Sequence, residues 1–228
     1  MATFCNIALM RSFRSFLLAV VVARGLQLAG QDAKKPHAVP KPGVGSASTC
    51  GPISDLSFKC ARFGFAYKVP FGWVDRTGDM DDSAEDGQPE TKEKGTSETL
   101  LAIFERPPGA PGETINSAVV IATESLANYQ GIKTAADYFG PIADLAEQRG
   151  FKVVNEPYEF ALGAKQLVRG DFSRERGKLT MWQSSLVMIE KGYIVSFTFV
   201  GGSEDELENL IGNLSFGMQT RLRTVPRK

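Results

Sequence analysis

The chain has 228 residues, of which 43% are hydrophobic and 23% charged, which is ordinary for a globular protein of one domain with tails. Its 26 lysines and arginines balance its 26 aspartates and glutamates, so the formal net charge is zero. This balance argues against a nucleic-acid-binding protein, which normally has a basic excess or a basic face, and it gives no general attraction to anionic membranes.

Residues 1–30 show the features of a secretory signal peptide in the usual order. Arg11 and Arg14 precede a short apolar run, and small residues follow it. Because this run is about half the length of the roughly 20 apolar residues that a membrane span needs, we expect a cleaved signal and no stable membrane insertion afterwards. We expect cleavage after Gly30, with Gly25 as the alternative, and an extracytoplasmic location, periplasmic or secreted.

Residues 31–49 are rich in proline, lysine, glycine and alanine and show no apolar period, which predicts a disordered linker. The linker contains His37, the only histidine of the chain. Ser-His or Cys-His catalysis therefore has no base in the folded part, and a histidine-ligated metal site is excluded there. The sequence also has none of the glycine-rich phosphate-binding motifs, so we predict no catalytic residue, no metal and no cofactor.

The three cysteines agree with export. Cys5 would be removed with the signal, which leaves Cys50 and Cys60. An even pair in an exported chain predicts a disulfide, which would stabilise the fold by about 2–3 kcal/mol. The alternatives are two free thiols in a reducing compartment, or a zinc site that would need further ligands.

The folded domain is expected over residues 50–218, followed by a basic tail over residues 219–228. Within the domain, the segment 77–98 is acidic and polar and predicts a long exposed loop, and loops of this length are either functional or disordered. Apolar alternation and turn residues predict strands over residues 63–70, 99–105, 117–125, 151–160, 165–173, 178–190 and 193–200.

The first of two expected helices follows the strand 117–125. Thr134, with Asp137 three residues later, is expected to cap it, and Gly150 fits its end. Gly140 and Pro141 are expected to break or kink this helix near its middle.

The second helix has the stronger sequence pattern. It is expected to begin at the capping box Ser203–Glu206 and to cover one face of the sheet. Its apolar stripe consists of Leu207, Leu210, Ile211 and Leu214. The predicted fold is therefore α+β, an antiparallel sheet of about six strands with helices packed on it.

Two charged motifs are interpreted as structural. The run from Asp79 to Asp86 resembles a calcium loop, but its sixth residue is Ala84 where such loops need glycine, so we interpret it as a solvated loop. Arg169-Gly170-Asp171 matches an adhesion tripeptide, and we interpret it as a chance match because it lies inside a predicted strand.

Three other residues carry little functional weight. Trp73 is interpreted as a core residue that closes the first hairpin, and Trp182 as half exposed on a strand. Asn213 begins a glycosylation sequon, which we discount because it lies at a helix end near the expected core.

Residues 65–73, FAYKVPFGW, resemble the opening motif of PsbP-like domains. The resemblance covers roughly residues 58–218, and it implies an α/β/α sandwich used for binding and assembly and not for catalysis. The metal-related role of the photosynthetic members does not carry over, because the domain has no histidine. Later landmarks of the resemblance are Gly150-Phe151, Leu162-Gly163-Ala164, Lys191-Gly192-Tyr193, Ser203–Glu206 and Leu214-Ser215-Phe216.

The sequence therefore predicts an exported, non-enzymatic binding or assembly module with an unknown extracytoplasmic protein partner. We expect its binding surface at the acidic segment 77–98 and the nearby sheet edge. A carboxylate-based hydrolase or a small-ligand carrier is the alternative, since paired acids are recognised in space and not in sequence.

Overall fold

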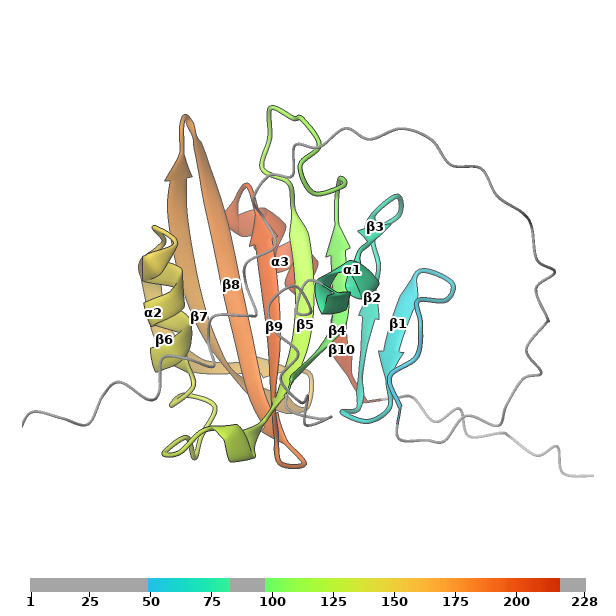
Figure 1. Ribbon diagram of the computed structural model, residues 1–228, viewed down its shortest axis with the longest axis vertical. Coiled ribbons are helices and arrows are strands. Elements are labelled where there is room, and N and C mark those ends of the chain that lie inside the picture. Colours follow the sequence, from blue (N-terminus) through green and yellow to red (C-terminus); the bar gives the residue numbers. More distant parts are fainter. Residues whose placement is uncertain (1–48, 83–96, 218–228) are drawn as a thin grey trace, which may run out of the picture.

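A computed structural model describes residues 49–82 and 97–217, which form two antiparallel sheets and three α-helices (Figure 1). The small sheet has the strand order β1 (Ser57–Cys60), β2 (Phe65–Lys68), β10 (Leu214–Phe216). The large sheet has the order β3 (Val74–Asp75), β4 (Ser97–Phe104), β5 (Ala118–Ser125), β9 (Tyr193–Gly201), β8 (Leu179–Glu190), β7 (Lys165–Arg176), β6 (Lys152–Leu162).

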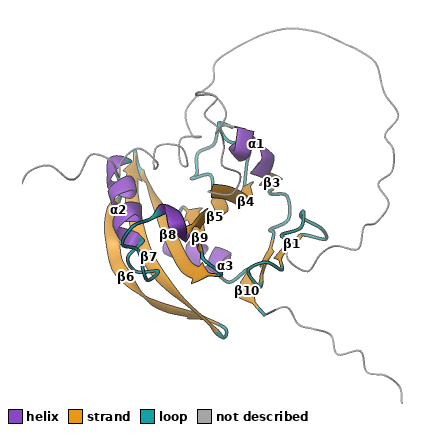
Figure 2. Ribbon diagram, turned by 60° about the horizontal axis from the view of Figure 1, so that its bottom comes forward, coloured by secondary structure: helices purple, strands orange, loops and turns teal. Residues whose placement is uncertain are grey.

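Helices cover the two faces of the large sheet unequally. Successive side chains of a strand point to opposite faces, and Leu186 and Val187 of β8 show what each face meets. Leu186 belongs to the main core with the helix α3 (Glu204–Ile211) and the small sheet, whereas Val187 packs with Phe139 of α2 (Phe139–Gln148). In Figure 2, α2 and the small sheet accordingly lie on different sides of the molecule. The expected antiparallel sheet with packed helices is thus confirmed in outline, with seven strands in the large sheet instead of about six.

The first predicted helix begins later than expected. The carboxylate of Asp137 accepts hydrogen bonds from the backbone N–H groups of Lys133 and Thr134, at 2.9 and 2.8 Å, and these bonds form a turn ahead of the helix. The helix α2 starts only at Phe139, so Pro141 is its third residue. Because the N–H groups of the first helical turn have no partner within the helix, proline is tolerated there, and the prediction of a break near the middle was wrong.

The predicted acidic loop 77–98 is shorter than expected at both ends. Thr77–Asp82 forms the helix α1, which begins after Asp75 accepts bonds from the backbone N–H and the hydroxyl of Thr77. At the other end, β4 begins at Ser97. Residues 83–96 lie outside the described part of the chain, as do the predicted signal 1–30, most of the linker 31–49 and the tail 219–228.

Cys50 and Cys60 form a disulfide bond in the structure, with their Cα atoms 3.9 Å apart. Cys60 ends β1 and is fully buried in the main core. The bond therefore fastens the first described residues to the small sheet. Among residues 49–82 and 97–217, no helix is long and apolar enough to cross a membrane.

The contact between α2 and the sheet depends on the absence of a side chain at Gly170. An ideal Cβ atom on Gly170 would lie 2.6 Å from Cε1 of Phe139, which is closer than real carbon atoms approach. The ring of Phe139 therefore packs directly on the backbone of β7.

We predict that Gly170→Ala lowers the free energy of unfolding by about 1–3 kcal/mol, because Phe139 must leave its position. Gly140→Ala is the matched control: it lies in α2 with no atom within 4 Å of the added Cβ. The control should leave stability unchanged or raise it by about 0.5–1 kcal/mol. Urea unfolding of both variants measures the difference, and equal effects of the two substitutions would contradict this packing.

Candidate functional site

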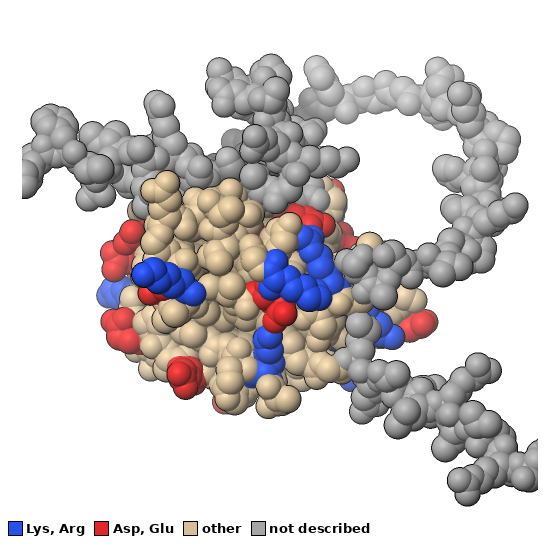
Figure 3. Space-filling view, turned by 90° about the horizontal axis from the view of Figure 1, so that it is seen from below, with Lys and Arg blue, Asp and Glu red and all other residues tan. Residues whose placement is uncertain are grey.

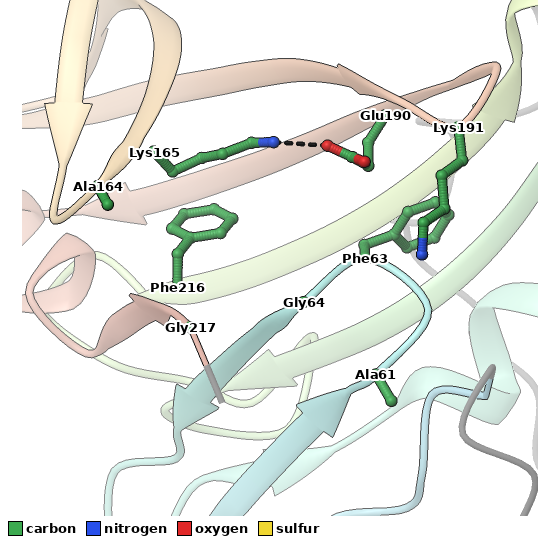
Figure 4. A pocket seen from close by; sticks show the side chains of 9 residues that line it. All are labelled: Ala61, Phe63, Gly64, Ala164, Lys165, Glu190, Lys191, Phe216 and Gly217. Atoms are coloured by element: carbon green, nitrogen blue, oxygen red, sulfur yellow. Dashed lines mark hydrogen bonds and ion pairs between the residues drawn. The ribbon is translucent and has the colours of Figure 1, made fainter. Parts of the chain in front are cut away.

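Four chain segments that are distant in sequence meet at the lower end of the molecule in Figure 1 and border an open depression of about 330 Å³. Three of them are the turns β1–β2, β6–β7 and β8–β9, and the fourth is the end of β10 (Figure 4). Figure 3 views this end from below and shows basic and acidic side chains next to one another on a largely uncharged surface. The main side chains that line the depression are Phe63, Ala164, Lys165, Glu190, Lys191 and Phe216.

Two phenylalanine rings line the depression: Phe216 is half-buried and forms its apolar wall, whereas Phe63 is only 4% exposed. Phe216 is held from behind by core rings, with ring centroids 6.3 Å from Phe65 and 6.0 Å from Phe197. Phe63 meets the ring of Tyr193 edge to face at 5.9 Å. Because these rings already pack against the core, an apolar group that enters the depression meets a rigid surface.

The charged groups of the wall differ in how they are neutralised. Nζ of Lys165 lies 2.5 Å from Oε2 of Glu190, so this pair joins β7 to β8 and carries no net charge (Figure 4). Nζ of Lys191 donates to the backbone carbonyl of Arg62 at 2.6 Å. None of the ion pairs identified among the described residues includes Lys191. Its ammonium group is therefore the cation that the wall offers to an anion.

The backbone of Lys191 is strained. Lys191 and Gly192 form the β8–β9 turn with φ angles of 53° and 79°, both in the left-handed region. Two-residue turns of this kind favour asparagine followed by glycine, and a lysine at the first position is energetically unfavourable. Strain at an exposed turn points to a use for the side chain, here the bond to Arg62 and the free charge beside the aromatic wall.

Arg62 extends the charged rim of the depression. Its guanidinium carbon lies 4.8 Å from the ring centroid of Phe63 and 4.2 Å from that of Tyr193, and Nη1 lies 3.3 Å from Oε2 of Glu98. These contacts, together with the bond from Lys191, hold the β1–β2 turn against the large sheet. The position of the depression therefore depends on a few polar and aromatic contacts between turns.

The described lining carries one acid, held in an ion pair, next to an apolar ring. A carboxylate hydrolase needs two acids that flank the substrate, and within the described lining Glu190 is the single carboxylate, held by Lys165. In the part of the chain that the structure describes, no group of three histidine, cysteine or acidic side chains is arranged to hold a metal ion. An apolar wall beside a cation instead fits an apolar group that lies next to a carboxylate.

The adhesion-like tripeptide is part of the interior. The side chains of Arg169 and Asp171 are only 8% and 7% exposed, and they bind each other at 2.9 Å. Nη2 of Arg169 also pairs with Glu208 of α3 at 2.6 Å. A receptor would have to reach both buried side chains, so the interpretation as a chance match agrees with the structure.

The remaining sequence candidates lie away from the depression lining. Trp73 and Trp182 are half-buried and pack against the main core. Asn213 is half-buried and its carbonyl accepts from the N–H of Lys68. Asp79 of the acidic run pairs with Arg76 at 2.9 Å, and the side chains of residues 81–86 of that run lie outside the described part of the chain.

The sequence interpretation missed the depression, because its residues come from three separate turns and the end of β10. The residues 163–164 and 191–192 were recognised only as turns. The available signal was the lysine in Lys191-Gly192, where the turn type favours asparagine.

A second polar cluster joins the segment 126–138 to β5. The hydroxyl groups of Tyr129 and Tyr138 both donate to the carboxylate of Glu124, Tyr138 at 2.8 Å, and the two rings meet edge to face at 5.4 Å. Burial is the main cause that raises the pKa of both tyrosines, and Glu124 raises each further. The cluster holds the segment 126–138 against β5, and its residues are not among those that line the depression.

This cluster predicts a loss of stability in alkali. The folded pKa values of Tyr129 and Tyr138 lie above the unfolded value of about 10. Their contribution to the free energy of unfolding is therefore complete below about pH 10 and is lost as the pH rises further. Urea unfolding between about pH 9 and about pH 11 should show a smaller decline in Tyr138→Phe than in the wild type. Equal declines in the two proteins would contradict this role.

No protein-family model and no curated protein matches the chain. Among solved structures, the chain is similar to cyanobacterial PsbP (CyanoP) from Synechocystis sp. PCC 6803, with 11% identity and a TM-score of 0.44 over 76% of this chain and 98% of that one. The Ran-binding protein Mog1p of Saccharomyces cerevisiae shares 13% identity with a TM-score of 0.36, over 66% and 78% of the two chains. LpqN of Mycobacterium tuberculosis, involved in cell envelope biogenesis, shares 13% identity with a TM-score of 0.35, over 68% and 83%. Similarities this low carry no statement about the function of this chain.

Proposed function

We propose that this protein is a non-enzymatic binding module that works outside the cytoplasm and holds a segment of a partner in the depression. One observation carries the proposal: a strained turn places the ammonium group of Lys191 in the lining of a depression whose apolar surface is the half-buried ring of Phe216, with the buried ring of Phe63 next to it. The expected ligand is an aromatic or aliphatic side chain with a carboxylate nearby. Aromatic anchors that fill small pockets supply much of the affinity of protein interfaces.

The compartment is inferred from two features of the chain. Residues 1–30 have the pattern of an export signal, and Cys50 and Cys60 are bonded. Disulfides persist in oxidising, extracytoplasmic compartments. The PsbP-like resemblance of residues 58–218 agrees with a role in binding and assembly. We also propose that the domain is an α/β/α sandwich of the PsbP-like kind.

A defined small probe tests the depression directly. N-acetylphenylalanine carries both an aromatic ring and a carboxylate. At millimolar concentration it should shift the backbone amide NMR signals of Gly64, Lys191 and Gly217, which line the depression. N-acetylphenylalaninamide lacks the charge and should shift them less, and N-acetylalanine lacks the ring and should leave them unchanged. Shifts elsewhere, or none, would overturn the assignment of the site.

Lys191→Asn separates binding from folding. Asparagine suits the left-handed turn, so the free energy of unfolding should stay within about 1 kcal/mol of the wild type although the bond to Arg62 is lost. Binding of N-acetylphenylalanine should weaken severalfold. Lys178→Asn is the matched control, because Lys178 is exposed and follows Gly177 in the β7–β8 turn at the opposite end of the strands. Equal affinities of the two variants would argue against a role of Lys191.

A further inference from the structure

Phe71 is an aromatic side chain that the fold holds out into solvent. It is 90% exposed, in the turn Pro70–Trp73 that joins β2 to β3. The N–H of Trp73 donates to the carbonyl of Pro70 at 3.4 Å, and Gly72 has a φ of 83°. A glycine with positive φ at the third position of such a turn fixes its type, so Phe71 at the second position is presented on a defined backbone.

Leu56 lies beside this turn in an unfavourable conformation. The backbone carbonyl of Leu56 accepts a hydrogen bond from the N–H of Val69 at 2.8 Å, and Val69 precedes Phe71 by two residues in the chain. Asp55 and Leu56 have φ angles of 50° and 53°, and a bulky residue in the left-handed region is strained. Leu56 is 45% exposed, so burial does not offset that strain. We call Leu56 and Phe71 together the apolar knob.

The apolar knob and the depression lie at opposite ends of the small sheet. The strand β2 starts at Phe65, directly after Gly64 in the depression lining, and ends at Lys68. Phe71 follows beyond the far end of this strand. One molecule therefore carries an exposed aromatic group at one end and an aromatic-walled depression at the other.

The two surfaces match in chemistry. The knob offers one aromatic and one aliphatic side chain, and the depression offers the half-buried ring of Phe216, with Phe63 only 4% exposed next to it. Asp55, exposed next to Leu56, is the counterpart of the ammonium group of Lys191. Lys68 adds a positive charge at the knob end and partly offsets the negative charge of Asp55. The proposed contact therefore depends mainly on the apolar side chains, and the attraction between Asp55 and Lys191 adds to it.

We propose that the apolar knob of one molecule enters the depression of a second copy of this chain. This inference rests on the proposed function of the depression and names its occupant. Because knob and depression lie at opposite ends, the contact is head to tail, and each new molecule leaves one knob and one depression free. A head-to-tail contact that does not close into a ring adds molecules one after another, so it produces an open series of oligomers and not a single dimer.

Sedimentation velocity of the full chain over a range of concentrations tests this self-association. The mean mass of the wild type should rise continuously with concentration. Phe71→Ser removes the aromatic side chain of the knob, and Ala164→Trp places a large side chain on an exposed turn residue that lines the depression. Each variant alone should remain a monomer. Leu179→Ser, which removes a leucine that is 37% exposed outside both surfaces, should associate as the wild type does.

Mixing the two variants gives the sharper result. The Phe71→Ser protein has an intact depression and the Ala164→Trp protein has an intact knob, so their mixture should form dimers and nothing larger. A wild type that stays monomeric at all concentrations, or a Phe71→Ser protein that still associates, would overturn the inference. If N-acetylphenylalanine binds at the depression and the wild type stays monomeric, the proposed function stands and the occupant belongs to another protein.

Discussion

The hydrogen-bonded carboxylate of Asp171 is the constraint on which the arrangement of β6, β7, β8 and α3 depends. It is almost fully buried, and each of its oxygens accepts two hydrogen bonds. A buried charge is tolerated only when it is paired and hydrogen-bonded, and removal of one partner from such a group typically costs about 3–5 kcal/mol. The four donors come from β6, β7 and β8, and they are Asn155, Tyr158, Arg169 and Ser184.

This polar hub positions two walls of the depression. The strand β6 is mostly exposed, so the bonds from Asn155 and Tyr158 supply fastening that apolar burial does not. The β6–β7 hairpin that they hold ends in the turn next to Lys165. Through Arg169 the hub also binds Glu208 of α3, and the chain after α3 continues into β10. The binding surface therefore lies on turns whose positions are set by a rigid interior, which is a common arrangement for binding sites.

The sequence predicted best where a local pattern and the tertiary structure agree. The capping box is a clear case: Oγ of Ser203 accepts from the N–H of Glu206, and the carboxylate of Glu206 accepts from the N–H of Gly202. The β8–β9 hairpin is another, because two long apolar runs flank Lys191-Gly192. The start of α2 was missed, since a proline reads equally as the first turn of a helix or as a break within it. The strands β1, β3 and β10 have four, two and three residues, too few for a period to show.

Local sequence patterns could not predict the site, because Phe63, Lys191 and Phe216 come together only where the small sheet packs on the large one. The central claim is that an aromatic group binds in this depression, against Phe216. Intermolecular NOEs between the ring protons of bound N-acetylphenylalanine and the protein test it most directly. We expect NOEs to the ring protons of Phe63 and Phe216. NOEs instead to exposed side chains of the sheet edge, such as Val153 and Tyr158 of β6, would contradict it.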